Sequence, residues 1–246
     1  MSLGATRVLG AAAGVTGAAA AVLGLALAPP DAVQGEAQRL MYVHVPSAWV
    51  AYLAFAVVLL ASVGYLLRRE LRWDRHAQAA AELGVGLTGL AIVTGSLWGR
   101  PVWGVWWAWE PRLITTVVLL VVYLGYLGIR RRGGDPHAGA RRAAVVGVAA
   151  FVNVPIVHFS VVWWRTLHQP PTVLRPGGPA ADIHPLMLAA LLTGVAAFTL
   201  AATWIHLRRV QVLADHDSAG QPTATRIDHG PQRPQVELTV TRKVLR

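Results

Sequence analysis

Tryptophan is the residue of this chain whose type and spacing most clearly indicate a chemistry. Five of its ten tryptophans lie within positions 98–109: Trp98, Trp103, Trp106, Trp107 and Trp109. Indole rings are large, flat and apolar, and they stack readily on other rings. If Pro101 begins a short helix, three of these indoles share one face. The cluster therefore predicts a platform for a large, flat, apolar ligand.

Histidines flank this segment on both sides in the sequence. A single imidazole is more often a structural residue than a ligand, but His44 and His168 form a pair on either side of the tryptophans. Two imidazoles from separate loops are the ligands that a bis-histidine haem iron requires. His158 lies ten residues before His168, and we expect it to face the bundle interior. The sequence assigns no role to His184.

Charged residues bracket the same cluster. Arg100 and Arg112 are either anchors on lipid phosphate or clamps for carboxylates such as haem propionates, whose geometry matches a guanidinium. Glu110 has three candidate partners, namely Arg112, an indole N–H or a histidine. The chain has no cysteine, which excludes disulfides, thiolate metal sites and covalent c-type haem attachment to this chain.

The composition predicts the elements that must position these residues. The chain is 54% hydrophobic and only 14% charged, with a mean hydropathy of +0.47, which is too apolar for a soluble domain. Apolar stretches long enough to cross a bilayer recur near 8–28, 45–67, 77–97, 113–129, 143–163 and 184–207. We predict an all-α polytopic membrane protein with six transmembrane helices.

The domain organisation follows from these stretches. Residues 1–209 form the predicted six-span membrane domain, which includes the Trp-rich segment 94–113, and residues 210–246 form a disordered cytoplasmic tail. The first stretch is interpreted as a retained helix, because its apolar run exceeds that of a signal peptide. Glu82 lies near the end of the third span, where its carboxylate can reach the interface or face the interior.

The basic residues predict the orientation of the spans. Of 22 lysines and arginines, 17 lie in alternate connecting segments and the tail, so that both termini are expected in the cytoplasm and the Trp-rich segment outside it. Eight of the ten tryptophans then lie on the outer side, whereas an ordinary aromatic belt would populate both interfaces. The net charge of +10 is dispersed over separate loops, which argues against nucleic-acid binding.

Three motifs carry a resemblance to a known family. They read TGSLWGRPVWGVWWAWEPRL at 94–113, MYVHVPSAW at 41–49 and NVPIVHFSVVWWRTLHQ at 153–169. The first resembles the tryptophan-rich WWD signature of haem-handling proteins. Together, and in this order, the three resemble the haem exporter protein C (CcmC) family of cytochrome c maturation over roughly residues 35–207.

The resemblance implies a function, a ligand and partners. It implies a multi-pass protein of the cell inner membrane that holds haem b non-covalently at the outer face and presents it to the haem chaperone CcmE. The implied partners are CcmD and the ABC transporter subunits CcmA and CcmB, in which ATP is hydrolysed. By motif position, His44 and His168 are the implied axial ligands of the iron. Glu110 departs from the family's usual aspartate at the end of the Trp motif.

Two other functions remain alternatives. The chain has no Walker motif and no acid–base pair positioned by its sequence, so that a non-enzymatic delivery component is predicted. A haem lyase or synthase that forms the cytochrome c thioether bond is the first alternative. A transmembrane haem channel is the second, although Glu82 and His158 alone offer little polar lining.

Overall fold

The computed structural model describes residues 3–130, 135–169 and 183–219, and these residues confirm the predicted all-α fold. The α-helices are α1 (Leu3–Ala21), α2 (Met41–Arg68), α3 (Leu71–Trp103), α4 (Pro111–Arg130), α5 (Pro136–Ala150), α6 (Asn153–Trp163) and α7 (Pro185–Ala219). A π-helical turn, η1 (Val22–Leu27), continues α1, and a 3₁₀ helix, η2 (Glu36–Leu40), leads into α2.

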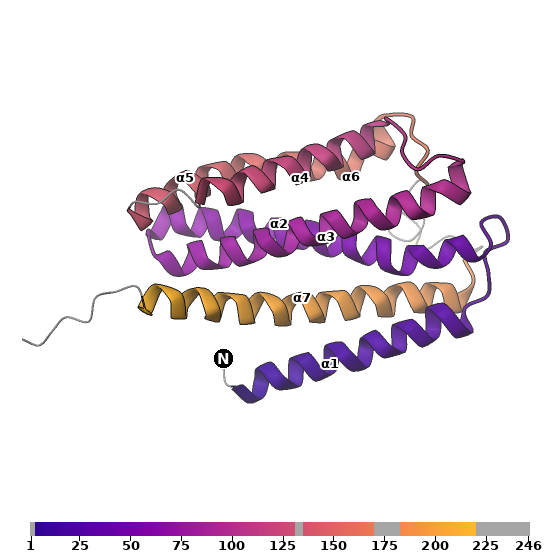
Figure 1. Cartoon of the computed structure of the whole chain (residues 1–246), viewed down its shortest axis with the longest axis horizontal. Helices are drawn as coiled ribbons and strands as arrows, with labels where there is room; N and C mark the ends of the chain where they lie inside the picture. Colours follow the sequence, from indigo (N-terminus) through magenta and orange to yellow (C-terminus); the bar gives the residue numbers. More distant parts are fainter. Residues whose placement is uncertain (1–2, 131–134, 170–182, 220–246) are drawn as a thin grey trace, which may run out of the picture.

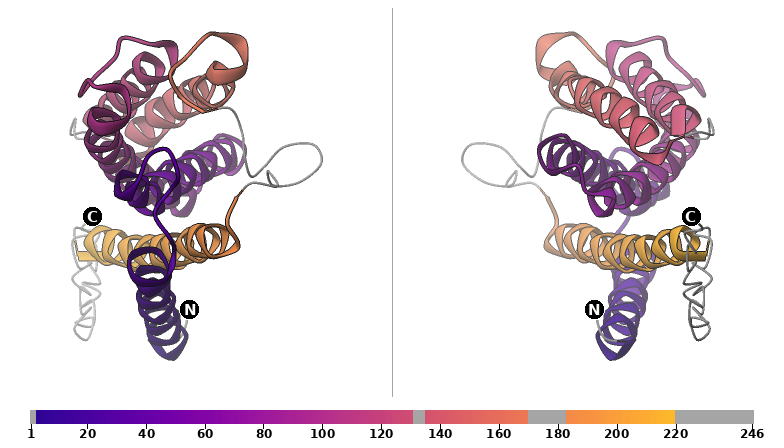
Figure 2. Two further views of the ribbon diagram at one scale, coloured as in Figure 1. Left: turned by 90° about the vertical axis from the view of Figure 1, so that its right-hand side faces the viewer. Right: turned by 90° about the vertical axis from the view of Figure 1, so that its left-hand side faces the viewer.

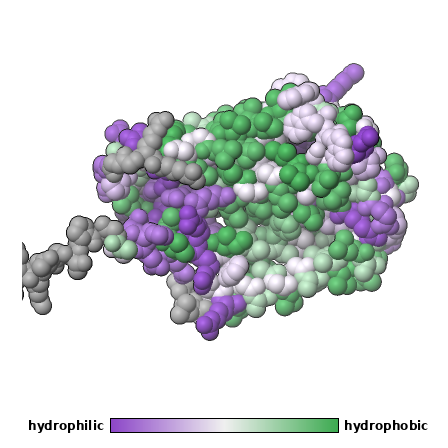
Figure 3. Space-filling view, viewed as in Figure 1, coloured by the Kyte–Doolittle hydropathy of each residue, from purple (hydrophilic) through white to green (hydrophobic). Residues whose placement is uncertain are grey.

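Six helical segments are long and apolar enough to cross a membrane, as predicted. They are Gly4–Leu27, Glu36–Arg68, Leu71–Trp103, Pro111–Arg130, Pro136–Trp163 and Pro185–Ala219. In space-filling view, hydrophobic residues form a broad band and hydrophilic residues gather at the two ends of the bundle (Figure 3). This distribution is what a bilayer requires of a protein that spans it.

Helices α2 to α7 form three layers. The most extensive contact joins α2 to α3 in the middle, with α4, α5 and α6 packed on one side and α7 on the other (Figure 1). Helix α1 lies outermost and packs mainly on α7, as the end-on views also show (Figure 2). Successive spans run in opposite directions, so the ends of α3 and α6 lie at the same end of the bundle as the starts of α2, α4 and α7 (Figure 1). We call this the Trp end.

Close packing of α2 on α3 depends on small residues opposite large ones. Phe55 is fully buried, and its ring stacks on Tyr123 of α4 with centroids 3.8 Å apart. A Cβ added at Gly84 would lie 2.5 Å from Phe55 Cε1, so that only glycine fits there. Lipid is as apolar as the side chains, so that the hydrophobic effect does not drive helices together inside a membrane. Small residues let the helices approach closely, and van der Waals packing then stabilises the contact.

The fifth span differs from the prediction because it consists of two helices. Helix α5 ends at Ala150, a turn follows, and α6 begins at Asn153. Pro155 has no backbone N–H to bond the carbonyl of Phe151, and it is tolerated only in the first turn of a new helix. The Asn153 side chain donates a hydrogen bond to the Thr115 carbonyl of α4 at 2.9 Å, which attaches the turn to its neighbour.

Three further expectations differ from the structure. Pro101 does not begin a helix; it lies inside α3, which ends at Trp103 because Gly104 adopts a left-handed conformation with φ of 78°. His158 is exposed and not buried in the interior, although its ring lies edge-on to Tyr52 of α2 and to Phe159. Helix α7 continues to Ala219, beyond the predicted start of the tail, and residues 220–246 lie outside the described residues.

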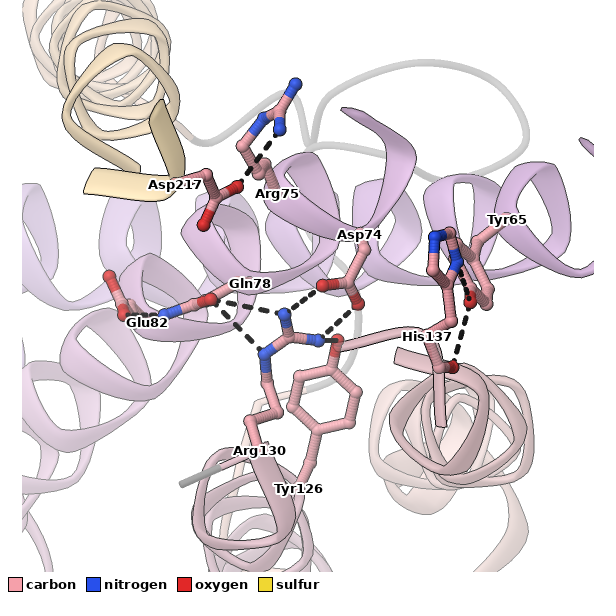
Figure 4. A network of polar contacts seen from close by, with 9 residues as sticks. All are labelled: Tyr65, Asp74, Arg75, Gln78, Glu82, Tyr126, Arg130, His137 and Asp217. Carbon is pink, nitrogen blue, oxygen red and sulfur yellow. Dashed lines mark hydrogen bonds and ion pairs between the residues drawn. The ribbon is translucent and has the colours of Figure 1, made fainter. Parts of the chain in front are cut away.

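Charged residues pair at the end of the bundle opposite the Trp end. Arg130 of α4 makes a two-pronged contact with Asp74 of α3, and Gln78 and Tyr126 complete the network (Figure 4). Glu82 accepts hydrogen bonds from Arg209 of α7, with Nη2 2.9 Å from Oε1. The Glu82 carboxylate thus finds a partner inside the protein, which offsets the cost of removing it from water.

Candidate functional site

A cavity opens at the Trp end between α2, α3 and α4. Six of the ten residues predicted for the site line it: His44, Trp103, Trp106, Trp107, Arg112 and His168. Its remaining wall is mainly apolar and includes Ala91 and Gly95 of α3 and Leu119 of α4. The structure therefore brings both predicted histidines to one place, although they are far apart in the sequence.

His44 lies in the first turns of α2 with its ring against α3. Its Nδ1 is 2.8 Å from the Ala91 carbonyl oxygen and 3.3 Å from Thr94 Oγ1. A carbonyl only accepts hydrogen bonds, so that the imidazole proton must be on Nδ1. A Cβ at Gly95 would lie 2.8 Å from His44 Cε1, which shows how closely α3 holds the ring. His44 Nε2 has no hydrogen-bond partner among the described residues and keeps its lone pair free.

His168 is held in the same way by a different acceptor. Its Nδ1 contacts Glu110 Oε1, and the backbone N–H of Leu167 donates to Glu110 Oε2 at 2.6 Å. One carboxylate thus fixes both the ring and the backbone before it. Trp103 packs edge-on against the ring, with centroids 5.0 Å apart. Within the described part of the chain, His168 Nε2 also makes no hydrogen bond, so it is available as a ligand.

The electrostatics of the Glu110–His168 pair favour a neutral imidazole. Burial, together with the nearby Arg112 guanidinium, lowers the pKa of His168 to about 3. Burial raises the pKa of Glu110, while the hydrogen bond from Leu167 and the charge of Arg112 act in the opposite direction. An ionised Glu110 can accept hydrogen bonds from the Leu167 N–H and from Nδ1–H of a neutral His168, and its negative charge is balanced by the nearby Arg112. A neutral imidazole oriented by a carboxylate is the form that ligates metals.

The tryptophans divide into two groups. Trp103, Trp106 and Trp107 line the cavity, and Trp106 keeps 57% of its surface exposed at the opening. Trp98 lies behind His44, with ring centroids 5.8 Å apart, and donates from Nε1 to Gln34 Oε1 at 2.9 Å. Trp109 is 80% exposed and touches Trp107 edge-on from outside the cavity. Of the five clustered indoles, three therefore line the cavity, one lies behind His44 and one lies outside the lining.

The two arginines also have different places. Arg112 is in the cavity lining, at the start of α4, where its charge acts on both histidines. Arg100 is exposed, and its guanidinium donates to the Gly104 carbonyl at the end of α3. It thus caps a helix terminus, where a cation interacts favourably with the helix dipole. Only Arg112 is placed to contact a ligand in the cavity.

Sequence reasoning missed the residues that hold His44 and its neighbour Trp98 from behind. Ala91 contributes only a backbone carbonyl, and Gly95 only the absence of a side chain. Gln34 lies in the connection before α2 and holds Trp98. No residue type signals any of these roles. His184, to which the sequence assigned no role, accepts a hydrogen bond from the Leu186 N–H at the start of α7.

The donor set can be tested against a haem. Two Nε2 atoms are free for iron, three indoles offer stacking surface, and Arg112 offers a cation for a carboxylate. Trp107 Nε1 is buried without a hydrogen-bond partner among the described residues, and it is a donor in need of an acceptor. The cavity encloses about 80 Å³, whereas pockets that bury a ligand measure roughly 300–1,000 Å³. The residues fit the group, and a haem bound to them would extend beyond the cavity that the described residues enclose.

These features define the class of protein: a polytopic helical membrane protein with two oriented imidazoles and several indoles around one cavity. The chain belongs to the family described as "Heme exporter protein C", whose sequence profile matches residues 1–222. A relative named heme exporter protein C in Bradyrhizobium diazoefficiens is 44% identical over 182 residues, which cover 74% of this chain and 68% of the relative.

More distant relatives are similar over comparable lengths. The heme exporter protein C of Escherichia coli K12 is 34% identical over 187 residues, covering 76% of this chain and 74% of the relative. A putative ccmC-like mitochondrial protein of cytochrome c biosynthesis in Marchantia polymorpha is 36% identical over 172 residues, covering 70% and 72%. The resemblance seen in the three motifs therefore extends through most of the membrane domain.

Proposed function

We propose that this chain holds haem b non-covalently at the Trp end and delivers it to the chaperone CcmE during cytochrome c maturation. The single observation that carries the proposal is that two histidines beside one cavity have the same hydrogen-bonding pattern. His44 and His168 each have Nδ1 occupied by an oxygen acceptor and Nε2 free. Metal-ligating histidines almost always have their other nitrogen fixed in this way.

Each residue of the site has a role in this proposal. When bound, haem supplies an iron with two axial positions, and His44 and His168 would fill them. Trp103, Trp106 and Trp107 would contact the porphyrin face, and Arg112 would bind a propionate. Glu110, Ala91 and Trp98 would act indirectly, by holding the histidines.

The small cavity favours delivery over storage. Because the cavity formed by the described residues is smaller than a porphyrin, one side of the haem would remain accessible to a partner protein. The exposed Trp106 at its opening would contribute to that presenting surface. A carrier that transfers its ligand needs an accessible ligand, whereas a resident cofactor is usually enclosed.

The setting proposed for this activity is the cell inner membrane. The Trp end would face the periplasm and both termini the cytoplasm, in agreement with the distribution of arginines. The names of the relatives support a role in haem export and cytochrome c biosynthesis. CcmA, CcmB and CcmD would complete the complex, and the energy of ATP hydrolysis would come from the ABC transporter subunits.

The test is a visible spectrum of the full chain, purified in detergent and titrated with haem. We expect the Soret and α bands of a six-coordinate bis-histidine haem. The His44→Ala and His168→Ala variants should each lose these bands, while His184→Ala, which lies outside the cavity, should keep them. Unchanged bands in both single variants would exclude these histidines as ligands. Transfer is then measured as covalent haem on CcmE in membranes that contain the partner subunits.

A further inference from the structure

A second recess lies at the end of the bundle opposite the Trp end. It is an open groove of about 910 Å³ between the end of α2, the end of α4 and the start of α5. Tyr65 is among its lining residues and is almost fully buried, with its hydroxyl donating to the His137 carbonyl at 2.9 Å. Figure 4 shows this contact between α2 and α5. The proposed haem delivery makes no use of this groove.

The rim of the groove carries uncompensated positive charge. Arg69, Arg141 and Arg142 line it, all three are exposed, and none forms an ion pair within the described ranges. Asp135 is the one carboxylate in the lining, and it is already engaged as the N-cap of α5, accepting from His137 N at 3.1 Å and Ala138 N at 3.0 Å. Three guanidiniums around one recess favour a ligand with anionic oxygens.

The wall of the groove changes from charged to apolar along α5. Arg141 and Val145 are four residues apart, as are Arg142 and Val146, so each arginine lies one turn above a valine. Val145 is 54% exposed, and Ile129 of α4 adds a further apolar contact. The order of guanidinium first and aliphatic side chain next, running into the apolar band, matches the order of headgroup and acyl chain in a phospholipid.

We propose that this groove binds an anionic phospholipid. Arg69, Arg141 and Arg142 contact the headgroup phosphate, and an acyl chain lies along Ile129 and Val145. Basic recesses between transmembrane helices are suited to acidic lipids. Their arginines attract the headgroup phosphate at the membrane surface, and the acyl chains remain in the apolar part of the bilayer. The bound lipid would fill the space between α2, α4 and α5 and join these helices at their ends.

The test uses the full chain, reconstituted in nanodiscs with equal amounts of phosphatidylglycerol and phosphatidylcholine. Lipids retained after transfer to detergent are counted by native mass spectrometry. We expect wild type to retain phosphatidylglycerol in preference. Replacing Arg69, Arg141 or Arg142 by Gln should lower this preference by about fivefold for each guanidinium removed. Arg208→Gln is the control, since Arg208 is exposed at the same end on α7 and outside the groove.

A second pair of variants examines the apolar wall. Val145→Ser should weaken retention of long-chain phosphatidylglycerol more than that of its dihexanoyl form. Val152→Ser, at a residue that is 63% exposed but outside the groove, should change neither. Equal retention of the two headgroups by wild type, or an unchanged preference in the triple arginine variant, would refute the proposal. Equal retention of the long-chain and dihexanoyl forms, with both displaced by millimolar inorganic phosphate, would also refute it, because the groove would then recognise the phosphate alone.

Discussion

Glu110 and His168 lie 58 residues apart in the sequence, and the carboxylate of the first contacts Nδ1 of the second. Glu110 also accepts the N–H of Leu167, so that one side chain at the start of α4 orients both the imidazole and the backbone that carries it. Carboxylates that fix the other nitrogen of a ligating histidine set its tautomer and strengthen its basicity. This relationship gives the clearest test of the proposed haem site.

Glu110→Gln should lower haem affinity by about 10- to 100-fold, since an amide is a weaker acceptor than a carboxylate and does not fix the tautomer. The measurement is a haem titration followed at the Soret band. Glu110→Asp should retain part of the affinity, because the charge is kept but the reach is shorter by one methylene. If Glu110→Gln binds haem as well as wild type, Glu110 has no positioning role.

Gly95→Ala should displace His44 without removing any ligand. The added Cβ would lie 2.8 Å from His44 Cε1, so that the ring must move away from the Ala91 carbonyl. We expect an affinity loss of about tenfold, as for other changes behind a ligand, together with a shifted Soret band. Gly89→Ala is the matched control, because nothing lies within 4 Å of a Cβ there. If the two variants bind haem with equal affinity in the same titration, α3 does not hold His44 in position for the ligand.

The tryptophans should contribute to haem affinity according to whether they line the cavity. Trp103→Leu and Trp107→Leu each remove a ring from the cavity lining and should lower haem affinity by about three- to tenfold. Trp109→Leu should have little effect, because this ring lies outside the lining and is 80% exposed. Haem occupancy after purification and the titration midpoint report the difference. Normal occupancy after joint replacement of the lining tryptophans would contradict the platform.

Arg112→Gln should remove the contact with a propionate, whereas Arg100→Gln should not, because Arg100 is directed to the Gly104 carbonyl. The expected loss for Arg112→Gln is about 10- to 100-fold, the usual range for a hydrogen bond to a charged group. Haem dimethyl ester, which has no carboxylate, distinguishes this cause from a general disturbance. Wild type should prefer free haem over the ester, and Arg112→Gln should bind both alike.

At the opposite end, Arg130→Gln should destabilise the bundle without affecting haem. Arg130 and Asp74 are only 11% and 13% exposed, so that removal of one partner leaves a buried charge unpaired. The free energy of unfolding in mixed micelles should fall by about 3 kcal/mol. The double variant Asp74→Asn/Arg130→Gln should regain part of this loss. A change in the haem spectrum would show that the two ends of the bundle are coupled.

Much of this protein could be predicted from local properties of the sequence. The length and hydropathy of each apolar stretch determine whether it can span a bilayer, and these properties are independent of the rest of the fold. The motifs around His44, the tryptophans and His168 likewise carry the family in short stretches of chain. The six spans and the family membership therefore follow from the amino-acid sequence alone.

Tertiary packing decided what local properties do not contain. Whether Trp103 lines the cavity and Trp109 does not depends on how α3 ends at Gly104 and where α4 begins. The partner of Glu110 was open in the sequence, because a contact across 58 residues depends on the packing of α4 beside α6. The turn that divides the fifth span into α5 and α6 was not visible in the continuous apolar stretch 143–163, and neither was the exposure of His158. Helix formation is local, whereas the facing of side chains depends on neighbours that the sequence leaves unspecified.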